Sequence, residues 1–365
     1  MREWLEGVSK NGVLSEIEGW GMDNLNDICD FLFGDATSGT MRDEDIPCVE
    51  TSDDTKLCKT PLVSVRVVTY NQEAYIGECL DSILRQKTNF DFEIVIGEDC
   101  SQDRTREICF EYQRRYPKCV RVLWSHENLY AIDGNLRRTI MHCRGKYIAF
   151  LEGDDYWTDP LKLQKQVDLI RATGSIGCVA NYATLSSTGR IKETRYKSNG
   201  FITHDDLAHF YPHTATYVIR RDFLEERERL FPKIHAWYDV VSMHCLVETG
   251  KVAHLQDVVS VYRQTGTGIA TGLSGQRKKL LGIKQYLDLY LNGPQSWHRR
   301  FGALVLTYIA FFFNRSTPGW TKNFTDEYSH DFKRLFWSIY WRQPLDFRTI
   351  RALMRYLRFQ LGFSD

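Results

Sequence analysis

Residues 149–159 read Ala-Phe-Leu-Glu-Gly-Asp-Asp-Tyr-Trp-Thr-Asp, an apolar run that ends in three carboxylates. The run predicts a buried strand, and Glu152, Asp154 and Asp155 would emerge where that strand ends. Two like charges about 4 Å apart repel by roughly 4 kcal/mol at an effective dielectric constant of about 20. We therefore expect this cluster to be partly protonated or to hold a cation, and Mg²⁺ or Mn²⁺ binds such oxygen ligands.

A helix start is the competing interpretation of these residues. Thr158 or Asp159 precedes Pro160, which is the pattern of a capping residue followed by proline in the first turn. The acidic residues would then only begin the next helix. This stretch alone does not decide between a cation site and a helix start.

Two segments upstream repeat the pattern of a strand that ends in polar residues. Phe92 to Gly97 predicts a strand that runs into Glu98-Asp99-Cys100-Ser101, and Val63 to Val68 predicts another that ends in Thr69-Tyr70-Asn71-Gln72. In a parallel sheet these loops share one edge, where ligands of open α/β sheets bind. The sequence therefore favours the cation site and predicts an α/β fold.

The order and spacing of these segments resemble the nucleotide-binding half of family-2 glycosyltransferases with the GT-A fold. The resemblance covers about residues 62–270, and the segment 152–166 is especially similar to bacterial enzymes that build surface polysaccharides such as O-antigen or capsule. It implies a Rossmann-like domain, in which helices flank a mostly parallel sheet. It also implies an enzyme that moves a sugar from a nucleoside-diphosphate sugar to a hydroxyl of a glycan acceptor.

The resemblance implies roles for the residues after the first two strands. Tyr70 would stack on the nucleobase of the donor, and Asp99 would contact the imide or amino edge of that base. Glu98 stands where many relatives have an aspartate and belongs to the same nucleotide-binding group.

In the segment 149–159, the resemblance matches Asp154 to the carboxylate that holds the metal and the diphosphate, and Asp155 adjoins it as a second metal ligand. Glu152 replaces the usual first aspartate. Its longer side chain favours a contact with the ribose, or one through water, over direct metal binding. The cofactor that the resemblance implies is Mn²⁺ or Mg²⁺.

Asp239 is the candidate catalytic base. It precedes an apolar pattern of helical spacing that ends at Thr249-Gly250, and relatives carry the base at this helix start. The alternative role is a helix cap, which is the commonest function of an aspartate in that position.

Two short β-rich runs, 251–254 and 258–261, lead into a loop from Tyr262 to Gly268 that resembles the loop closing these catalytic domains. Arg263 is a candidate diphosphate contact because its forked guanidinium matches phosphate oxygens, and the alternative is a surface arginine. Relatives often carry a histidine two residues beyond this arginine. Here that position is Thr265, and this departure weakens the case for a metal ligand in the loop.

One candidate base without a separate nucleophile favours inversion of the sugar carbon over double displacement. Two other functions stay open. A sugar nucleotidyltransferase would need a glycine-rich basic loop, which residues 69–74 lack. A non-catalytic binding or scaffold protein could keep the fold without the chemistry.

The two ends of the chain differ in charge. Residues 1–60 carry fourteen acidic and five basic residues and predict a short helix and an acidic linker. Residues 61–270 are the expected GT-A domain, and residues 271–365 form a helical, basic and aromatic region. Its last helical stripe of arginines beside apolar residues either lies in an anionic membrane interface or packs on the catalytic domain.

Ten cysteines without paired spacing indicate reduced thiols, and the first residues lack the pattern of a secretory signal. We therefore expect a cytoplasmic protein, peripheral on the inner face of the cytoplasmic membrane if the C-terminal region binds lipid. The expected partners are a nucleotide-sugar donor and a glycan or lipid-linked glycan acceptor. Nucleic acid is not expected because the chain contains no recognisable nucleic-acid-binding module.

Overall fold

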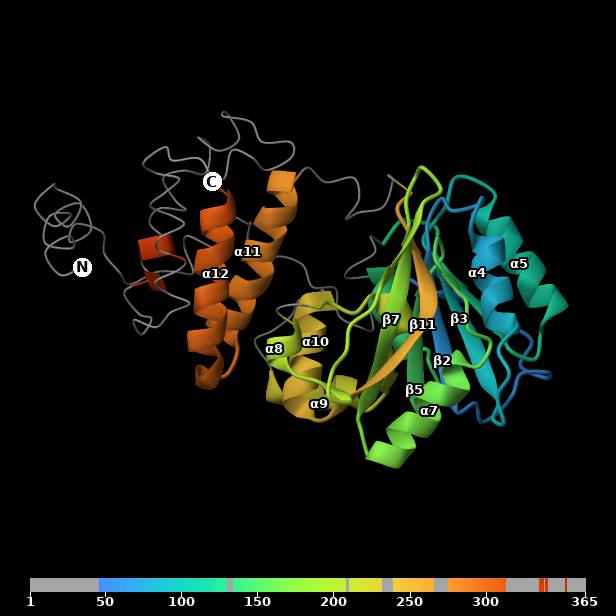
Figure 1. Cartoon of the computed structure of the whole chain (residues 1–365). Helices are drawn as coiled ribbons and strands as arrows, with labels where there is room; N and C mark the ends of the chain where they lie inside the picture. Colours follow the sequence, from blue (N-terminus) through green and yellow to red (C-terminus); the bar gives the residue numbers. More distant parts are fainter. Residues whose placement is uncertain are drawn as a thin grey trace, which may run out of the picture. The chain divides into compact units, whose positions relative to one another are not determined.

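The computed structural model describes residues 46–129, 134–207, 210–231, 239–265, 275–312, 335–337, 339–340 and 352. These residues fall into two compact units, one within 46–265 and the other within 275–352 (Figure 1). The predicted N-terminal helix and the last amphipathic helix lie outside the described residues.

The first unit is built on a mixed sheet, whose central strand order is β1-β4-β3-β2-β5-β10-β7-β11-β6. The strands are β1 Val49–Thr51, β2 Val63–Thr69, β3 Phe92–Glu98, β4 Val120–Trp124, β5 Tyr147–Glu152, β6 Tyr156–Trp157, β7 Gly177–Leu185, β8 Ile191–Thr194, β9 Phe201–Ile202, β10 Val218–Arg220 and β11 Val252–Arg263. Strands β4, β3, β2 and β5 run parallel, so their carboxyl ends meet at one edge as predicted. Beyond them β10 is antiparallel to both β5 and β7.

Helices pack on both faces of this sheet. They are α4 Ile76–Leu84, α5 Thr105–Arg115, α6 Leu136–Met141, α7 Lys162–Thr173, α8 His204–Leu207, α9 Phe223–Leu230 and α10 Asp239–Thr249, with a 3₁₀ turn, η3, at Thr214–Thr216. Alternation along β2 divides its side chains between the faces. Val65 and Val67 join the core that α4, α5 and α7 cover, whereas Arg66 lies on the other face with residues of α6, α9 and α10.

Strand β11 differs from its sequence-based prediction. The two β-rich runs of the sequence form one strand, parallel to β7 and interrupted by register shifts between Leu255 and Val258 and between Val258 and Val261. Gln256 and Asp257 are exposed at the first shift. Polar residues at an irregularity break the sequence pattern without ending the strand.

The described part of the second unit contains α11 Gly275–Asn292, a 3₁₀ turn at Gln295–Trp297, η4, and α12 His298–Phe312. The two helices pack on each other: Phe301 of α12 lies 6.1 Å from the ring of Tyr286 and 5.1 Å from that of Trp297. The apolar residues that begin α12 are thus largely buried against protein. Among the described residues, none of the helices combines the length and apolar character needed to cross a bilayer.

Candidate functional site

The loops after β2, β3 and β5 meet at the carboxyl edge of the sheet. The backbone N–H of Asp99 donates to Thr69 O at 3.1 Å, and that of Gly153 donates to Val68 O at 2.9 Å. A Cβ added at Gly153 would lie 2.5 Å from Gln72 Oε1 and 2.7 Å from Thr69 Oγ1. Only glycine allows the β5 loop to approach the β2 loop this closely.

The loops after β2 and β3 are tied together through side chains. Asn71 N donates to Ser101 Oγ at 3.0 Å, and Gln72 N donates to Thr105 Oγ1 at 2.7 Å. Tyr70, which precedes these contacts, stays 45% exposed. Its ring is therefore open to a ligand, as stacking on a nucleobase requires.

The carboxylates at the end of β3 find their partners within the chain. Glu98 is fully buried, accepts a hydrogen bond of 2.6 Å from Ser101 N and forms an ion pair with Arg106. Asp99 is 2% exposed and accepts from Leu129 N at 2.8 Å. Burial raises the pKa of Asp99, although the Leu129 N–H opposes that shift. Glu98 therefore shapes the loop, and the Asp99 carboxylate is held by the segment that contains Leu129.

The carboxylates at the end of β5 are less well compensated. Glu152 accepts from Arg66 Nη2 at 3.1 Å and from Thr214 Oγ1 at 2.9 Å. Burial and the charge of Glu152 raise the pKa of Asp154 to about 6. Burial and the neighbouring Asp154 raise the pKa of Asp155 well above its ordinary value. The cluster thus gains stability from any added positive charge.

A metal-binding geometry includes a histidine that the sequence analysis missed. One ligand atom each from Glu152, Asp155 and His213 lies within 4.8 Å of the others. Asp155 Oδ2 is 3.7 Å from His213 Nδ1, and the imidazole stacks on Tyr262 with ring centroids 4.4 Å apart. Burial lowers the pKa of His213, which favours the neutral imidazole that binds metals. His213 belongs to no motif, so the sequence offers no signal for it.

Arg263 lies beside the acidic cluster and is engaged by its own chain. Its Nη1 donates to Asp154 O at 3.0 Å, and its guanidinium forms an ion pair with Glu78. The same group lies over the rings of Tyr75 and Tyr156, with distances of 5.2 and 4.6 Å to the centroids. Arg263 therefore braces the β5 loop against α4, and a diphosphate contact would come in addition to these interactions.

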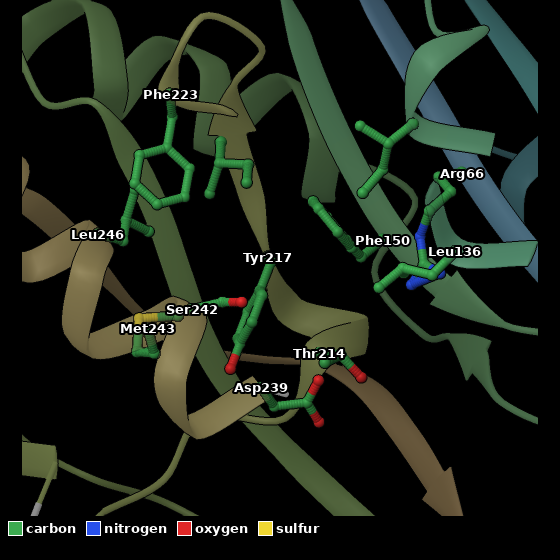
Figure 2. Close-up of a pocket in the computed structure, with 12 residues that line it drawn as sticks. Arg66, Leu136, Phe150, Thr214, Tyr217, Phe223, Asp239, Ser242, Met243 and Leu246 are labelled. Atoms are coloured by element: carbon green, nitrogen blue, oxygen red, sulfur yellow. The ribbon is translucent and has the colours of Figure 1, made fainter. Parts of the chain in front are cut away.

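Asp239 is the first residue of α10 and lines a pocket with Thr214, Tyr217 and Arg66 (Figure 2). Its side chain is accessible to water, yet the surrounding protein and Glu152 raise its pKa to about 7, against the influence of Arg66. A carboxylate with a pKa near neutrality can accept a proton at physiological pH.

The structure therefore divides the predicted site residues between two neighbouring groups. Glu152, Asp154, Asp155, Asp239 and Arg263 gather around the end of β5. Tyr70, Glu98 and Asp99 lie at the ends of β2 and β3. The first group can hold a cation and accept a proton, and in the second group the ring of Tyr70 is exposed whereas Asp99 is buried.

Comparisons with known proteins identify proteins that are similar to this chain in sequence. Residues 64–227 match the model of the family described as Glycosyl transferase family 2. An uncharacterized protein of Mycobacterium tuberculosis is 29% identical over 227 residues, which are 60% of this chain and 63% of that protein. The glycosyltransferase TuaG of Bacillus subtilis, whose provisional name assigns it to teichuronic acid biosynthesis, is 26% identical over 221 residues, covering 60% of this chain and 85% of TuaG. The chain thus spans somewhat less than two thirds of the length of the mycobacterial relative.

Solved structures show the same fold. The structure of residues 1–349 of Staphylococcus aureus TarS in complex with UDP-GlcNAc matches with a TM-score of 0.57 and 17% identity. The match covers 82% of this chain and 92% of the TarS chain. The likeness supports the predicted GT-A fold class at the level of fold alone.

Proposed function

We propose that this chain, whose residues 64–227 form a glycosyl transferase family 2 domain, moves a sugar from a nucleoside-diphosphate sugar to a glycan in polysaccharide biosynthesis. The observation that carries the proposal is the juxtaposition of Glu152, Asp155 and His213 with Asp239. A cation site beside a proton acceptor is what glycosyl transfer from a diphosphate donor needs.

Glu152, Asp155 and His213 would hold a divalent cation, with Asp154 adjoining them. Two carboxylates and a neutral imidazole fit Mn²⁺ better than Mg²⁺, because Mg²⁺ prefers oxygen ligands alone. When bound, the ion neutralises charge on the departing nucleoside diphosphate. Glu152 was expected to avoid direct contact with the metal, and the ligand geometry instead favours a direct role for it.

Asp239 accepts the proton of the acceptor hydroxyl in this proposal. Its pKa of about 7 leaves roughly half of the carboxylates ionised at neutral pH, which suits a general base. Tyr70 and Asp99 hold the nucleobase, and Arg263 positions the loop that carries Asp154. With one base at the site, the transfer inverts the configuration of the sugar carbon.

The acceptor is a glycan, and we propose that a lipid carries it. The assignment of TuaG to teichuronic acid biosynthesis supports the glycan acceptor. The name of dTDP-rhamnosyl transferase RfbG of Shigella flexneri, which is 30% identical over 163 residues, 44% of this chain and 55% of that protein, supports a nucleotide-sugar donor. O-antigen and capsule are the classes of product that we consider. The basic C-terminal region would bring the enzyme to an anionic membrane surface.

The test is to incubate the purified protein, with Mn²⁺ or with a chelator, either with nucleotide sugars or with a nucleoside triphosphate and a sugar phosphate. Release of nucleoside diphosphate is measured in the first incubation and release of pyrophosphate in the second. We expect metal-dependent release of nucleoside diphosphate. Pyrophosphate release from a nucleoside triphosphate and a sugar phosphate would indicate a nucleotidyltransferase instead. Neither product, with no nucleotide binding by calorimetry, would indicate a non-catalytic scaffold.

A further inference from the structure

The pocket beside Asp239 has apolar walls and one polar end (Figure 2). Its volume is about 50 Å³. The apolar walls come from β5, β10, α6, α9 and α10 and include Phe150, Ile219, Leu136, Ile140, Phe223 and Leu246. Arg66, Thr214, Asp239 and Ser242 supply the polar groups. The pocket therefore suits a small group that is apolar on one side and polar on the other.

Arg66 gives this pocket an unused hydrogen-bonding capacity. The side chain is 2% exposed, and its Nη2 donates to Glu152. Its Nε and Nη1 groups have no hydrogen-bond partner among the described residues. A buried donor without a partner destabilises the folded protein because it has lost its hydrogen bonds to water. A ligand that brings an acceptor atom to Arg66 would offset part of this destabilisation.

Charge and size restrict what that ligand can be. Glu152 and Asp239 already place two carboxylates near the single guanidinium, so a ligand carboxylate would be repelled. A neutral carbonyl oxygen fits better. Since one water-sized group needs about 10–15 Å³, the pocket holds roughly three to five non-hydrogen atoms. An acetamido group has four such atoms, including a methyl for the apolar walls.

We propose that this pocket binds the acetamido group of an N-acetylated amino sugar, with its carbonyl oxygen accepting from Arg66 and its methyl against the apolar walls. The inference rests on the proposed sugar transfer. In a 2-acetamido sugar, the substituted carbon adjoins both the anomeric carbon, which reacts in a donor, and the 3-hydroxyl, which can react in an acceptor. A pocket next to the proposed base Asp239 therefore fits the acetamido group of a donor sugar or that of an acceptor sugar.

The experiment compares sugars that differ only in this group. In the donor arm, calorimetry with Mn²⁺ measures the binding of UDP-N-acetylglucosamine against UDP-glucose and of UDP-N-acetylgalactosamine against UDP-galactose. In the acceptor arm, saturation-transfer NMR compares the methyl glycosides of N-acetylglucosamine and glucose. We expect the acetamido compound to bind at least about tenfold more tightly in one of the two arms.

Two variants and a matched control assign that preference to the pocket. Ile140→Phe fills the pocket, and Arg66→Lys keeps the positive charge while removing the forked donors. Each should lower the preference at least about tenfold. Met141→Phe introduces the same ring at the next residue of α6, where the side chain is 46% exposed, and should leave the preference unchanged. The melting temperature of each variant identifies any that fails to fold.

Equal binding of acetamido and hydroxyl sugars in both arms would overturn the inference, and so would a preference that Ile140→Phe does not change. Failure of the proposed function looks different. If Ile140→Phe weakens the binding of acetamido sugars while UDP does not bind at all, the inference about the pocket is retained and the proposed nucleotide-sugar donor is rejected.

Discussion

The ends of β3 and β5 carry similar acidic sequences in different electrostatic surroundings. At β3, Glu98 pairs with Arg106 and Asp99 accepts from a backbone N–H, so both carboxylates have partners in the chain. At β5, burial and the charge of Glu152 raise the pKa of Asp154, and burial and the charge of Asp154 raise the pKa of Asp155, which faces the imidazole of His213.

This difference shows that an acidic pair at a strand end does not by itself define a cation site. What distinguishes the two ends is whether the protein compensates the negative charge internally. The β3 end is compensated and builds a framework for the base site. The β5 end is left with excess negative charge, which a divalent ion would offset.

The largest expected effect is at Asp239, which acts with the β5 end. Asp239→Asn should lower kcat by about 10² to 10⁴ and leave donor binding nearly intact, because asparagine cannot accept the proton. Steady-state kinetics and calorimetry measure the two quantities. Asp222→Asn, at the start of α9, is the control for removing an acidic charge at a helix start. Near-normal turnover of Asp239→Asn would leave Asp239 with a capping role only.

At the β3 end, Glu98→Gln should reduce the free energy of unfolding by about 3 kcal/mol, because it leaves Arg106 without its buried partner. Mn²⁺ affinity should not change. Glu107→Gln removes an exposed ion pair with Arg104 and should change the free energy of unfolding far less than Glu98→Gln does. Denaturant titration gives the stabilities. A large loss of Mn²⁺ affinity in Glu98→Gln would end the distinction between the two ends.

Asp155→Asn should show the opposite of Glu98→Gln, with little change in stability and a clear loss of Mn²⁺ affinity. The amide oxygen can still accept from Arg263 N, so folding should be little affected, while Mn²⁺ affinity should fall about 10- to 100-fold. Calorimetry with Mn²⁺ and UDP measures this, with the exposed Asp168→Asn as control. Unchanged Mn²⁺ affinity would remove Asp155 from the metal site. Asp154→Asn should also weaken metal-dependent donor binding if Asp154 shares the ion.

Asp99→Asn tests the base-binding role of the β3 end. The substitution keeps an oxygen for Leu129 N and changes only the pattern offered to the base. We expect the donor KM to rise about tenfold with little change in kcat, as when uniform binding is lost. An equal fall in kcat at saturating donor would give Asp99 a chemical role.

The smallest expected effect is a pH dependence at the β5 end. The pKa of Asp154 is about 6 in the folded protein, above its ordinary value of 3.8, so its contribution to stability is lost as pH rises through about 6. In metal-free buffer, Asp154→Asn should therefore become more stable relative to the natural protein as pH increases from 5 to about 7. Calorimetric melting at each pH gives the comparison, and a difference that does not depend on pH would contradict it.

Much of the carboxyl edge of the sheet could be predicted from the sequence because local patterns define it. The strands β2, β3 and β5, their shared edge and the position of Asp239 at a helix start all follow from hydrophobic spacing and strand-end residues. The three-residue strand β10 is too short for such a pattern, and its antiparallel pairing with β5 and β7 depends on tertiary packing.

The partners of the carboxylates were not predictable from local sequence. Arg66 alternates with valines in β2, and only the fold shows that it is buried against Glu152. His213 reaches Asp155 from a separate segment. The spacing of the sequence gives no indication that this imidazole and the carboxylates Glu152 and Asp155 come together. Long-range contacts of this kind leave no spacing in the sequence.

The hydrogen bonds that join the β2 and β3 loops have a consequence for dynamics. Five backbone N–H groups donate across the two loops, from Asn71, Gln72, Glu73, Gln102 and Arg104, each to a side-chain oxygen of the other loop. Opening either loop breaks the same bonds, so these amides should exchange with deuterium as one cooperative unit. A nucleotide then meets a preorganised surface and sacrifices little loop entropy on arrival.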